Sequence, residues 1–126
     1  MTVTTSNTND EPIFHMALPD DWAAAFTTGE YRMATRGVTL EQEGFIHCST
    51  REQLPDTANR FDRDLDQLVV RTIDPALVAS PLVSEPPAPD HDGRCPHIYG
   101  PQPIAAVNDA TPWTRHPDTD WSTDTL

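Results

Sequence analysis

The stretch that decides the fold is EGFIHCST, Glu43 to Thr50, near the middle of the chain. Its apolar run from Phe45 to Cys48 is entered through a glycine and predicts a strand. Ser49 and Glu52 stand three residues apart directly behind this run, which is the spacing of a capping box at a helix N-terminus. The stretch therefore predicts a strand that runs through a capped turn into a helix.

Upstream of this stretch, apolar runs predict one strand and one helix. Residues 13–16 are expected to form the strand, and residues 18–26 the helix, which ends at Gly29. Trp22 and Phe26 are spaced i and i+4, so they are expected to form the apolar face of this helix. Residues 31–42 show no clean period and are expected to be loop with at most one short strand.

Downstream, the helix behind Ser49 carries Leu54, Ala58 and Phe61 at i, i+4 and i+7. Pro55 falls inside it, so the helix either kinks there or begins later, near Gln53. The other expected segments are strands at 66–74, 82–84 and 104–107 and a proline-rich loop at 86–94.

The length of 126 residues predicts one domain. We place it at 12–115, between a disordered polar lead at 1–11 and a polar tail at 116–126 that is expected to fray. Eight basic residues, all arginines, face twenty acidic ones, and the net charge of −12 disfavours nucleic acid as a partner. No apolar run approaches the roughly 18 residues of a membrane helix, and no secretory signal begins the sequence. We therefore expect a cytoplasmic protein that contacts neither nucleic acid nor membrane.

The two cysteines, Cys48 and Cys95, are expected to be free thiols in that compartment. Cys48 precedes a helix N-terminus, which can lower the pKa of a thiol and make it a nucleophile, but cysteine is also among the most buried residue types. His47 and His97 would complete a conceivable zinc set with the two cysteines, yet no Cys-x-x-Cys or His-x-x-x-His spacing is present. We expect no metal site.

Three histidines, His15, His47 and His97, lie in or beside apolar runs. One such histidine is usually a core residue, but three that face one cleft can hold hydroxyls, phosphates or a metal. The amides of the helix N-terminus behind Ser49 can hold an anion. Glu85 closes a strand just before a proline pair. Its carboxylate could lie at the rim of a cleft, or it could simply end the strand in solvent.

The stretches Glu43–Thr50, Pro96–Pro101 and Ile13–His15 together resemble the bacterial family known as domain of unknown function 952. The resemblance covers roughly residues 12–113 and implies an α+β fold similar to that of ADP-ribosyltransferases. Such a fold is a small single domain with short strands in two small sheets and two or three helices.

More distantly, the order of elements is similar to that of NAD-using ADP-ribosyltransferases and RNA 2′-phosphotransferases. Phe14–His15 matches the aromatic-histidine pair of their first strand, and His47–Thr50 matches the strand that enters a helix through hydroxyls. Met16 and Ala17 stand where the transferases have Gly-Thr. Their late catalytic glutamate has no secure match, and Glu85 is its best placement.

This resemblance implies a small-molecule ligand, with NAD as the expected cofactor. The implied catalytic residues are Glu85 and His47, and the implied cofactor-binding residues are His15, Tyr31, Ser49, Gln53, His97 and Tyr99. His15 and Ser49 would hold ribose hydroxyls, Tyr31 or Tyr99 would stack on the nicotinamide, and Glu85 would stabilise the oxocarbenium-like charge of glycosidic cleavage. The alternative is a non-catalytic binding module for a small phosphorylated or nucleotide-like ligand. The sequence does not indicate the oligomeric state.

Overall fold

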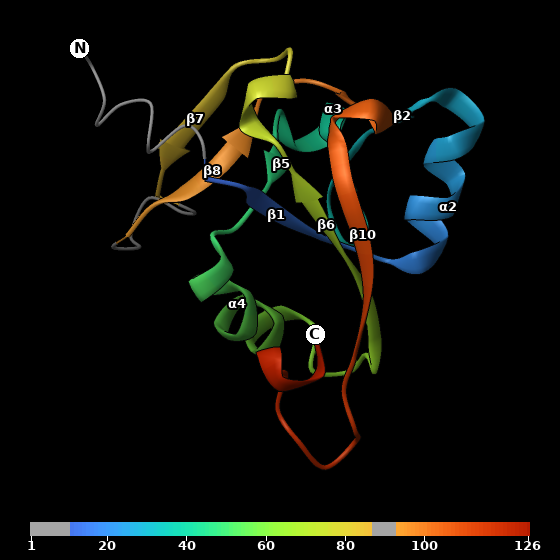
Figure 1. Cartoon of the computed structure of the whole chain (residues 1–126), viewed down its shortest axis with the longest axis vertical. Coiled ribbons are helices and arrows are strands. Elements are labelled where there is room, and N and C mark those ends of the chain that lie inside the picture. Colours follow the sequence, from blue (N-terminus) through green and yellow to red (C-terminus); the bar gives the residue numbers. More distant parts are fainter. Residues whose placement is uncertain (1–10, 87–92) are drawn as a thin grey trace.

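The computed structural model describes residues 11–86 and 93–126 and has an α+β architecture (Figure 1). Its α-helices are α2 (Pro19–Thr28), α3 (Leu40–Glu43) and α4 (Leu54–Phe61). Its strands are β1 (Ile13–Ala17), β2 (Glu30–Tyr31), β3 (Met33–Thr35), β4 (Val38–Thr39), β5 (Ile46–His47), β6 (Gln67–Ile73), β7 (Leu82–Glu85), β8 (Cys95–Ile98), β9 (Gln102–Pro103) and β10 (Val107–Thr114). Short 3-10 helices are η1 (Arg51–Gln53), η2 (Pro75–Leu77), η3 (Ile104–Ala106) and η4 (Thr123–Thr125).

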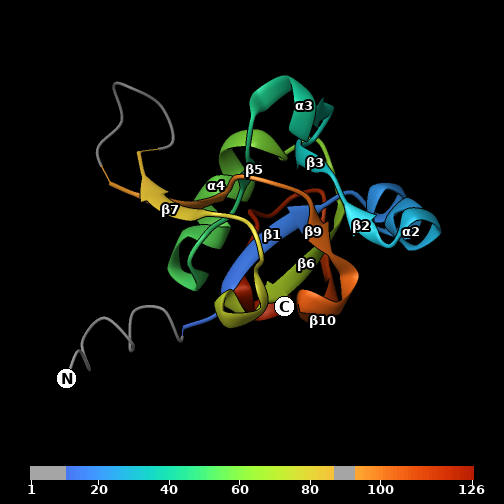
Figure 2. The same cartoon turned by 90° about the horizontal axis from the view of Figure 1, so that it is seen from above.

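The strands pair in several small antiparallel sheets. One three-stranded sheet has the order β1-β6-β10, and a second has the order β5-β8-β7. The pairs β2-β9 and β3-β4 are two-stranded, so the expectation of two small sheets is corrected to four within the described residues. From above, α2 lies on one side of the central strands β1 and β6, and β7 lies on the other side (Figure 2).

A single isolated bridge joins β1 to the segment behind β5. Phe14 N donates to Ser49 O at 2.9 Å, and Ser49 N donates to Phe14 O at 2.7 Å. This bridge brings the first strand, which carries His15, beside the stretch that carries His47. Two motifs that are far apart in the sequence therefore meet at one place.

The core consists of two clusters of buried side chains. One contains Tyr31, Ile46, Cys48, Ile73 and Ile98 among others. The second lies beneath α4 and contains Phe14, Leu54, Ala58, Leu68, Val70, Trp113 and Trp121. Each buried large apolar side chain contributes about 1.5–3 kcal/mol relative to exposure, so these clusters carry most of the stability of the fold.

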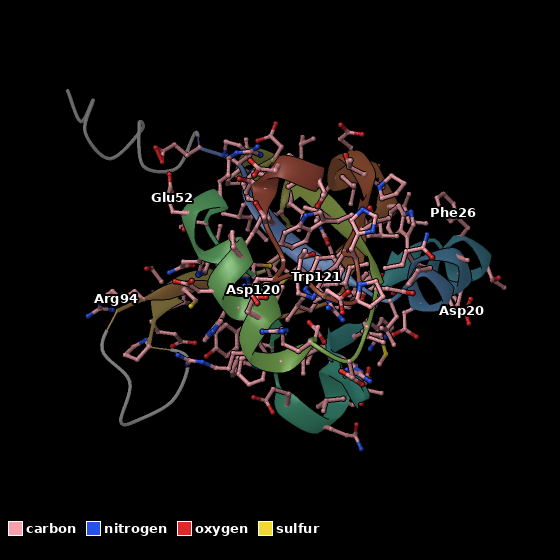
Figure 3. The ribbon with its side chains drawn as sticks, turned by 90° about the horizontal axis from the view of Figure 1, so that it is seen from below. Asp20, Phe26, Glu52, Arg94, Asp120 and Trp121 are labelled. Atoms are coloured by element: carbon pink, nitrogen blue, oxygen red, sulfur yellow. The ribbon has the colours of Figure 1, made fainter. Side chains whose placement is uncertain are left out.

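Helix α2 confirms the prediction for residues 18–26. Pro19 occupies its first turn, and Gly29 ends it in the left-handed conformation with a φ of 85°. The predicted apolar face is only half correct, because Trp22 packs against the core whereas Phe26 remains 60% exposed. Figure 3 shows Phe26 on the outer side of α2.

The segment 31–42 is more ordered than the prediction of a loop with one short strand. It contains part of β2, all of β3 and β4, and most of α3. Helix α3 begins with a capping box, in which Gln42 N donates to Thr39 Oγ1 at 3.2 Å and Thr39 N donates to Gln42 Oε1 at 2.8 Å. Strands of two or three residues are too short to give a periodic signal, which explains the error.

The capped turn behind β5 is displaced by one residue from the predicted position. Thr50, not Ser49, precedes the first helical turn, and Thr50 N donates to Gln53 Oε1 at 2.9 Å. Pro55 stands in the first turn of α4, so the helix begins near Gln53 and needs no kink.

The last part of the chain corrects two expectations. Residues 104–106 form η3, and the strand follows as β10, because a four-residue apolar run does not distinguish a strand from a helical turn. The tail after Trp113 does not fray, since Trp121 is only 2% exposed. Figure 3 shows Trp121 beside α4. The predicted lead up to residue 10 and residues 87–92 of the predicted loop lie outside the described residues.

Candidate functional site

A pocket of about 630 Å³ lies between α4, the turn behind β5, the β3-β4 turn and the start of β8. Its volume falls within the roughly 300–1,000 Å³ that small-molecule sites occupy. Four of the eight candidate residues line it: His15, His47, Ser49 and Gln53. Strand β1 supplies His15, and β5 with the segment behind it supplies His47 and Ser49. The bridge between Phe14 and Ser49 holds these two segments together.

His15 forms the buried floor of this pocket. Its Nδ1 lies 2.6 Å from His47 O, and its Nε2 lies 3.0 Å from the Tyr31 hydroxyl. A carbonyl oxygen can only accept, so the Nδ1–H group donates to it. Nε2 therefore carries no proton and accepts a hydrogen bond from the Tyr31 hydroxyl. Burial and the nearby Arg71 guanidinium lower the pKa of His15 well below the ordinary 6.5. His15 is therefore a neutral imidazole of fixed tautomer that fixes the backbone at His47.

Tyr31 lies behind His15 and does not line the pocket. Its ring is covered by the guanidinium of Arg71, whose Cζ lies 3.7 Å from the ring centroid. Arg71 also donates to Gln102 Oε1, and Gln102 is paired with Tyr31 in the β2-β9 sheet. Burial raises the pKa of Tyr31, so its hydroxyl stays protonated. With one ring face against Arg71 and the hydroxyl bonded to His15, Tyr31 supports His15 from behind.

Sequence reasoning missed Arg71 and Gln102. Arg71 is 0% exposed in the middle of β6, and its Nε and Nη2 have no hydrogen-bond partner among the described residues. Burial lowers its pKa to about 10, so it remains a cation at neutral pH. The available signal was a lone arginine within the β-branched run of residues 68–73.

His47 stands at the side of the pocket. Its Nε2 lies 3.1 Å from Glu43 Oε2, and burial lowers its pKa although this hydrogen bond acts in the opposite direction. The neighbouring Cys48 is buried, and that burial raises the pKa of its thiol to about 12. A thiol with this pKa is almost wholly protonated at neutral pH, which argues against the nucleophilic role considered for Cys48.

Glu85, His97 and Tyr99 form a second group that does not line the pocket. His97 Nδ1 donates to Glu85 Oε2 at 2.7 Å, and the Tyr99 hydroxyl donates to the same oxygen. Both hydrogen bonds lower the pKa of Glu85, and the one from Tyr99 has the larger effect. The His97 ring is stacked on Phe45 with centroids 4.2 Å apart, and it meets the His47 ring edge-on at 5.0 Å. His47 is therefore the residue at which the two groups meet.

The pocket is lined by charged side chains that were not among the candidate site residues predicted from the sequence. Three of the eight arginines of the chain line it, namely Arg36, Arg60 and Arg94. Three carboxylates, Glu52, Asp56 and Asp62, balance them. Figure 3 shows Glu52 and Arg94 on the α4 and β8 sides of the molecule. In a chain with a net charge of −12, this region is close to neutral.

Gln53 ties two walls of the pocket together. Its Nε2 donates to Arg94 O at 2.7 Å, while its Oε1 accepts from Thr50 N. Cys48 and Cys95 are free thiols. Within residues 11–86 and 93–126, no group of three His, Cys, Asp or Glu side chains is arranged to hold a metal ion. None of the described helices has the length and apolar character of a membrane span.

Among solved structures, the chain is similar to three of one protein of Caulobacter crescentus, CC0527. Its crystal structure superposes with a TM-score of 0.75 at 23% identity and covers 90% of this chain and 95% of that chain. A double mutant of it gives a TM-score of 0.74 at 23% identity over the same shares. Its solution structure gives a TM-score of 0.57 at 24% identity, with 90% and 89% covered. At these identities the likeness concerns the fold alone.

No curated protein matches the chain. A family model described as "Protein of unknown function (DUF952)" matches residues 16–110, which include the first strand from Met16, the stretch EGFIHCST and the segment 96–101. Because the match spans most of the sequence, the chain belongs to the DUF952 family.

Proposed function

We propose that the pocket binds a small ligand of the NAD or ADP-ribose type. The observation that carries this proposal is the gathering of Arg36, Arg60 and Arg94 at one pocket of a strongly acidic chain. Arginine presents several N–H donors in a planar fork that matches phosphate oxygens. Both ring nitrogens of His15 are already engaged, so of the two residues that the resemblance to ADP-ribosyltransferases assigns to the ribose, Ser49 is the one that could offer its hydroxyl to the ligand.

Two of these arginines have no carboxylate partner within the described part of the chain. Arg36 is held by Asp62 and Asp64, with its Nη2 2.7 Å from Asp64 Oδ2. Arg60 and Arg94, in contrast, make no ion pair with any residue in 11–86 or 93–126. Arg94 donates one N–H to Ser84 O at 2.9 Å, and we propose that its remaining side-chain donors, which bond no residue in 11–86 or 93–126, bind the phosphate.

Calorimetric titration with NAD, ADP-ribose, ADP and inorganic pyrophosphate tests the proposal. Arg60→Gln should lower the affinity for diphosphate ligands by roughly tenfold or more, because it removes a charge-assisted hydrogen bond. Arg63→Gln is the matched control, since Arg63 pairs with Asp120 and does not line the pocket. Absence of binding of all four ligands to the wild-type chain, or equal losses in both variants, would contradict the proposal.

A second proposal is that the chain cleaves the bound NAD in the manner of an ADP-ribosyltransferase. The bond between ribose C1′ and the nicotinamide nitrogen would break, and its electron pair would leave with neutral nicotinamide. Water or another acceptor would then bond to C1′ and lose a proton. The lowered pKa of Glu85 favours this role, because an ionised carboxylate stabilises the developing cation.

The position of Glu85 favours the alternative, a module that binds without turnover. Glu85 does not line the pocket and reaches it only through His97 and His47. Release of nicotinamide from NAD separates the two proposals. If the chain is an enzyme, Glu85→Gln should keep NAD binding and slow release by roughly 100- to 1,000-fold, while the exposed Glu41→Gln should not. NAD that is bound and never cleaved would identify the binding module.

A further inference from the structure

Phe61 is an aromatic side chain whose position the packing of α4 does not explain. Leu54 and Ala58 on the same helix are fully buried, whereas Phe61, at i+7 from Leu54, is 64% exposed. Burial of such a ring would stabilise the fold, and a polar residue would serve equally well at an exposed helix end. Exposure alone is common in proteins, so a second observation is needed.

The second observation is that Phe61 lines the pocket. Among the described residues, the exposed large apolar side chains are Phe26, Phe61, Leu77, Val83 and Tyr99, and Phe61 alone of these is part of the pocket wall. Arg60, its neighbour in α4, lines the same pocket. An exposed ring and a guanidinium from adjacent positions of α4 therefore both line this cavity.

We infer that Phe61 is the stacking platform for the purine base of the ligand. This inference rests on the proposed function, because a nucleotide is the ligand class that carries both a phosphate for the pocket arginines and a flat ring for Phe61. A base and an aromatic side chain stack with a contribution that tolerates different bases, since every base has a π-face. Phe61 thus determines the preference for ligands with a base over simple phosphates.

The experiment compares ligands with and without a base. Binding of ADP, ADP-ribose, ribose 5-phosphate and inorganic pyrophosphate is measured by calorimetry for the wild type, Phe61→Ala, Phe61→Tyr and Phe26→Ala. Phe61→Ala should lower the affinity for ADP and ADP-ribose by roughly 5- to 150-fold and leave the affinity for pyrophosphate unchanged. Phe61→Tyr should restore the affinity, and Phe26→Ala, which removes an equally exposed ring outside the pocket, should have no effect.

A fluorescence readout complements the titration. In a Phe61→Trp variant, ADP should quench the added indole, and pyrophosphate should not, whereas a Phe26→Trp variant should respond to neither. Urea unfolding of Phe61→Ala should match the wild type, because an exposed ring contributes little to the core.

The possible outcomes distinguish the stacking role of Phe61 from the proposed function of the pocket. If the wild type binds none of the probes, the proposed function falls and the role of Phe61 falls with it. If the wild type binds ADP and pyrophosphate equally well, or if Phe61→Ala weakens both ligands to the same extent, only the stacking role is overturned.

Discussion

His15 connects the floor of the pocket to the interior of the protein. One ring nitrogen fixes the carbonyl of His47, and the other receives the hydroxyl of Tyr31, whose ring lies under Arg71. A histidine in such a position favours the neutral form, because protonation would place a second positive charge in the interior near the buried Arg71 guanidinium. Burial is the main cause that lowers the pKa of His15, and the Arg71 charge is the second.

The two histidines of lowered pKa predict how stability depends on pH. Below the ordinary pKa of 6.5 the unfolded chain binds protons that folded His15 and His47 do not bind, so the free energy of unfolding falls as the pH is lowered. From about pH 7.5 to about pH 5.5, each histidine contributes a slope of at most ~1.4 kcal/mol per pH unit. Urea unfolding at several pH values measures this slope.

The variant His15→Gln keeps a hydrogen-bonding side chain and does not titrate, so its slope should be shallower than that of the wild type. His116→Gln, at an exposed position outside the pocket, is the matched substitution control. An equal slope in His15→Gln and the wild type would show that His15 is not the group responsible.

Among the elements, residues 115–126, which follow β10, are held against α4 by Trp121. Trp121 Nε1 donates to Asp62 O at 3.0 Å, and Trp121 N donates to Asn59 Oδ1 at 2.7 Å. Its ring lies 4.7 Å from that of Trp113. The segment therefore closes the second core cluster, although its composition is polar.

Trp121→Ala should reduce the free energy of unfolding by about 3–5 kcal/mol, because it leaves a large cavity beneath α4. Urea unfolding followed by far-UV circular dichroism measures the loss. Thr123→Ala, at an exposed position of η4, should change stability by no more than about 0.5 kcal/mol. A small loss for Trp121→Ala would mean that this segment docks only weakly.

The elements that could be predicted from the sequence carry their signals locally. Pro19 and Gly29 mark the ends of α2, and the β-branched run around Val70 marks β6. Strands β2 and β9 could not be predicted, because two residues have no period and their pairing joins Tyr31 to the distant Gln102. Trp121 was missed because one apolar residue in a polar segment does not reveal its partner.

The same distinction holds for the candidate site. His47, Ser49 and Gln53 belong to one local motif, and the predicted strand-turn-helix brings them to one pocket wall. The pocket arginines come from three separate segments, the β3-β4 turn with Arg36, helix α4 with Arg60, and the start of β8 with Arg94. Only the packing of those segments reveals that they meet.

The whole molecule is dominated by its negative charge. Its net charge of −12 acts against a compact state through self-repulsion. The ion pairs of Arg32, Arg36 and Arg63 involve largely exposed side chains, and such pairs contribute little.

Added salt should therefore stabilise the protein. Between about 0.02 M and about 0.3 M NaCl the Debye length shortens, and repulsion among the carboxylates is screened more than the few ion pairs are weakened. The urea midpoint, measured at constant pH, should rise with NaCl, and KCl should have the same effect. A midpoint that falls with salt would show that the arginine pairs outweigh the repulsion.

The place of β6 between β1 and β10 also governs how the chain reaches its fold. Both partners are distant in the sequence, so each pairing must close a long loop before its hydrogen bonds form. Domains with such pairing fold in roughly milliseconds to seconds. During synthesis, β6 keeps one unpaired edge until residues 107–114 leave the ribosome, and an unpaired apolar edge is a template for association. The nascent chain, more than the finished protein, is therefore the state that is vulnerable to aggregation.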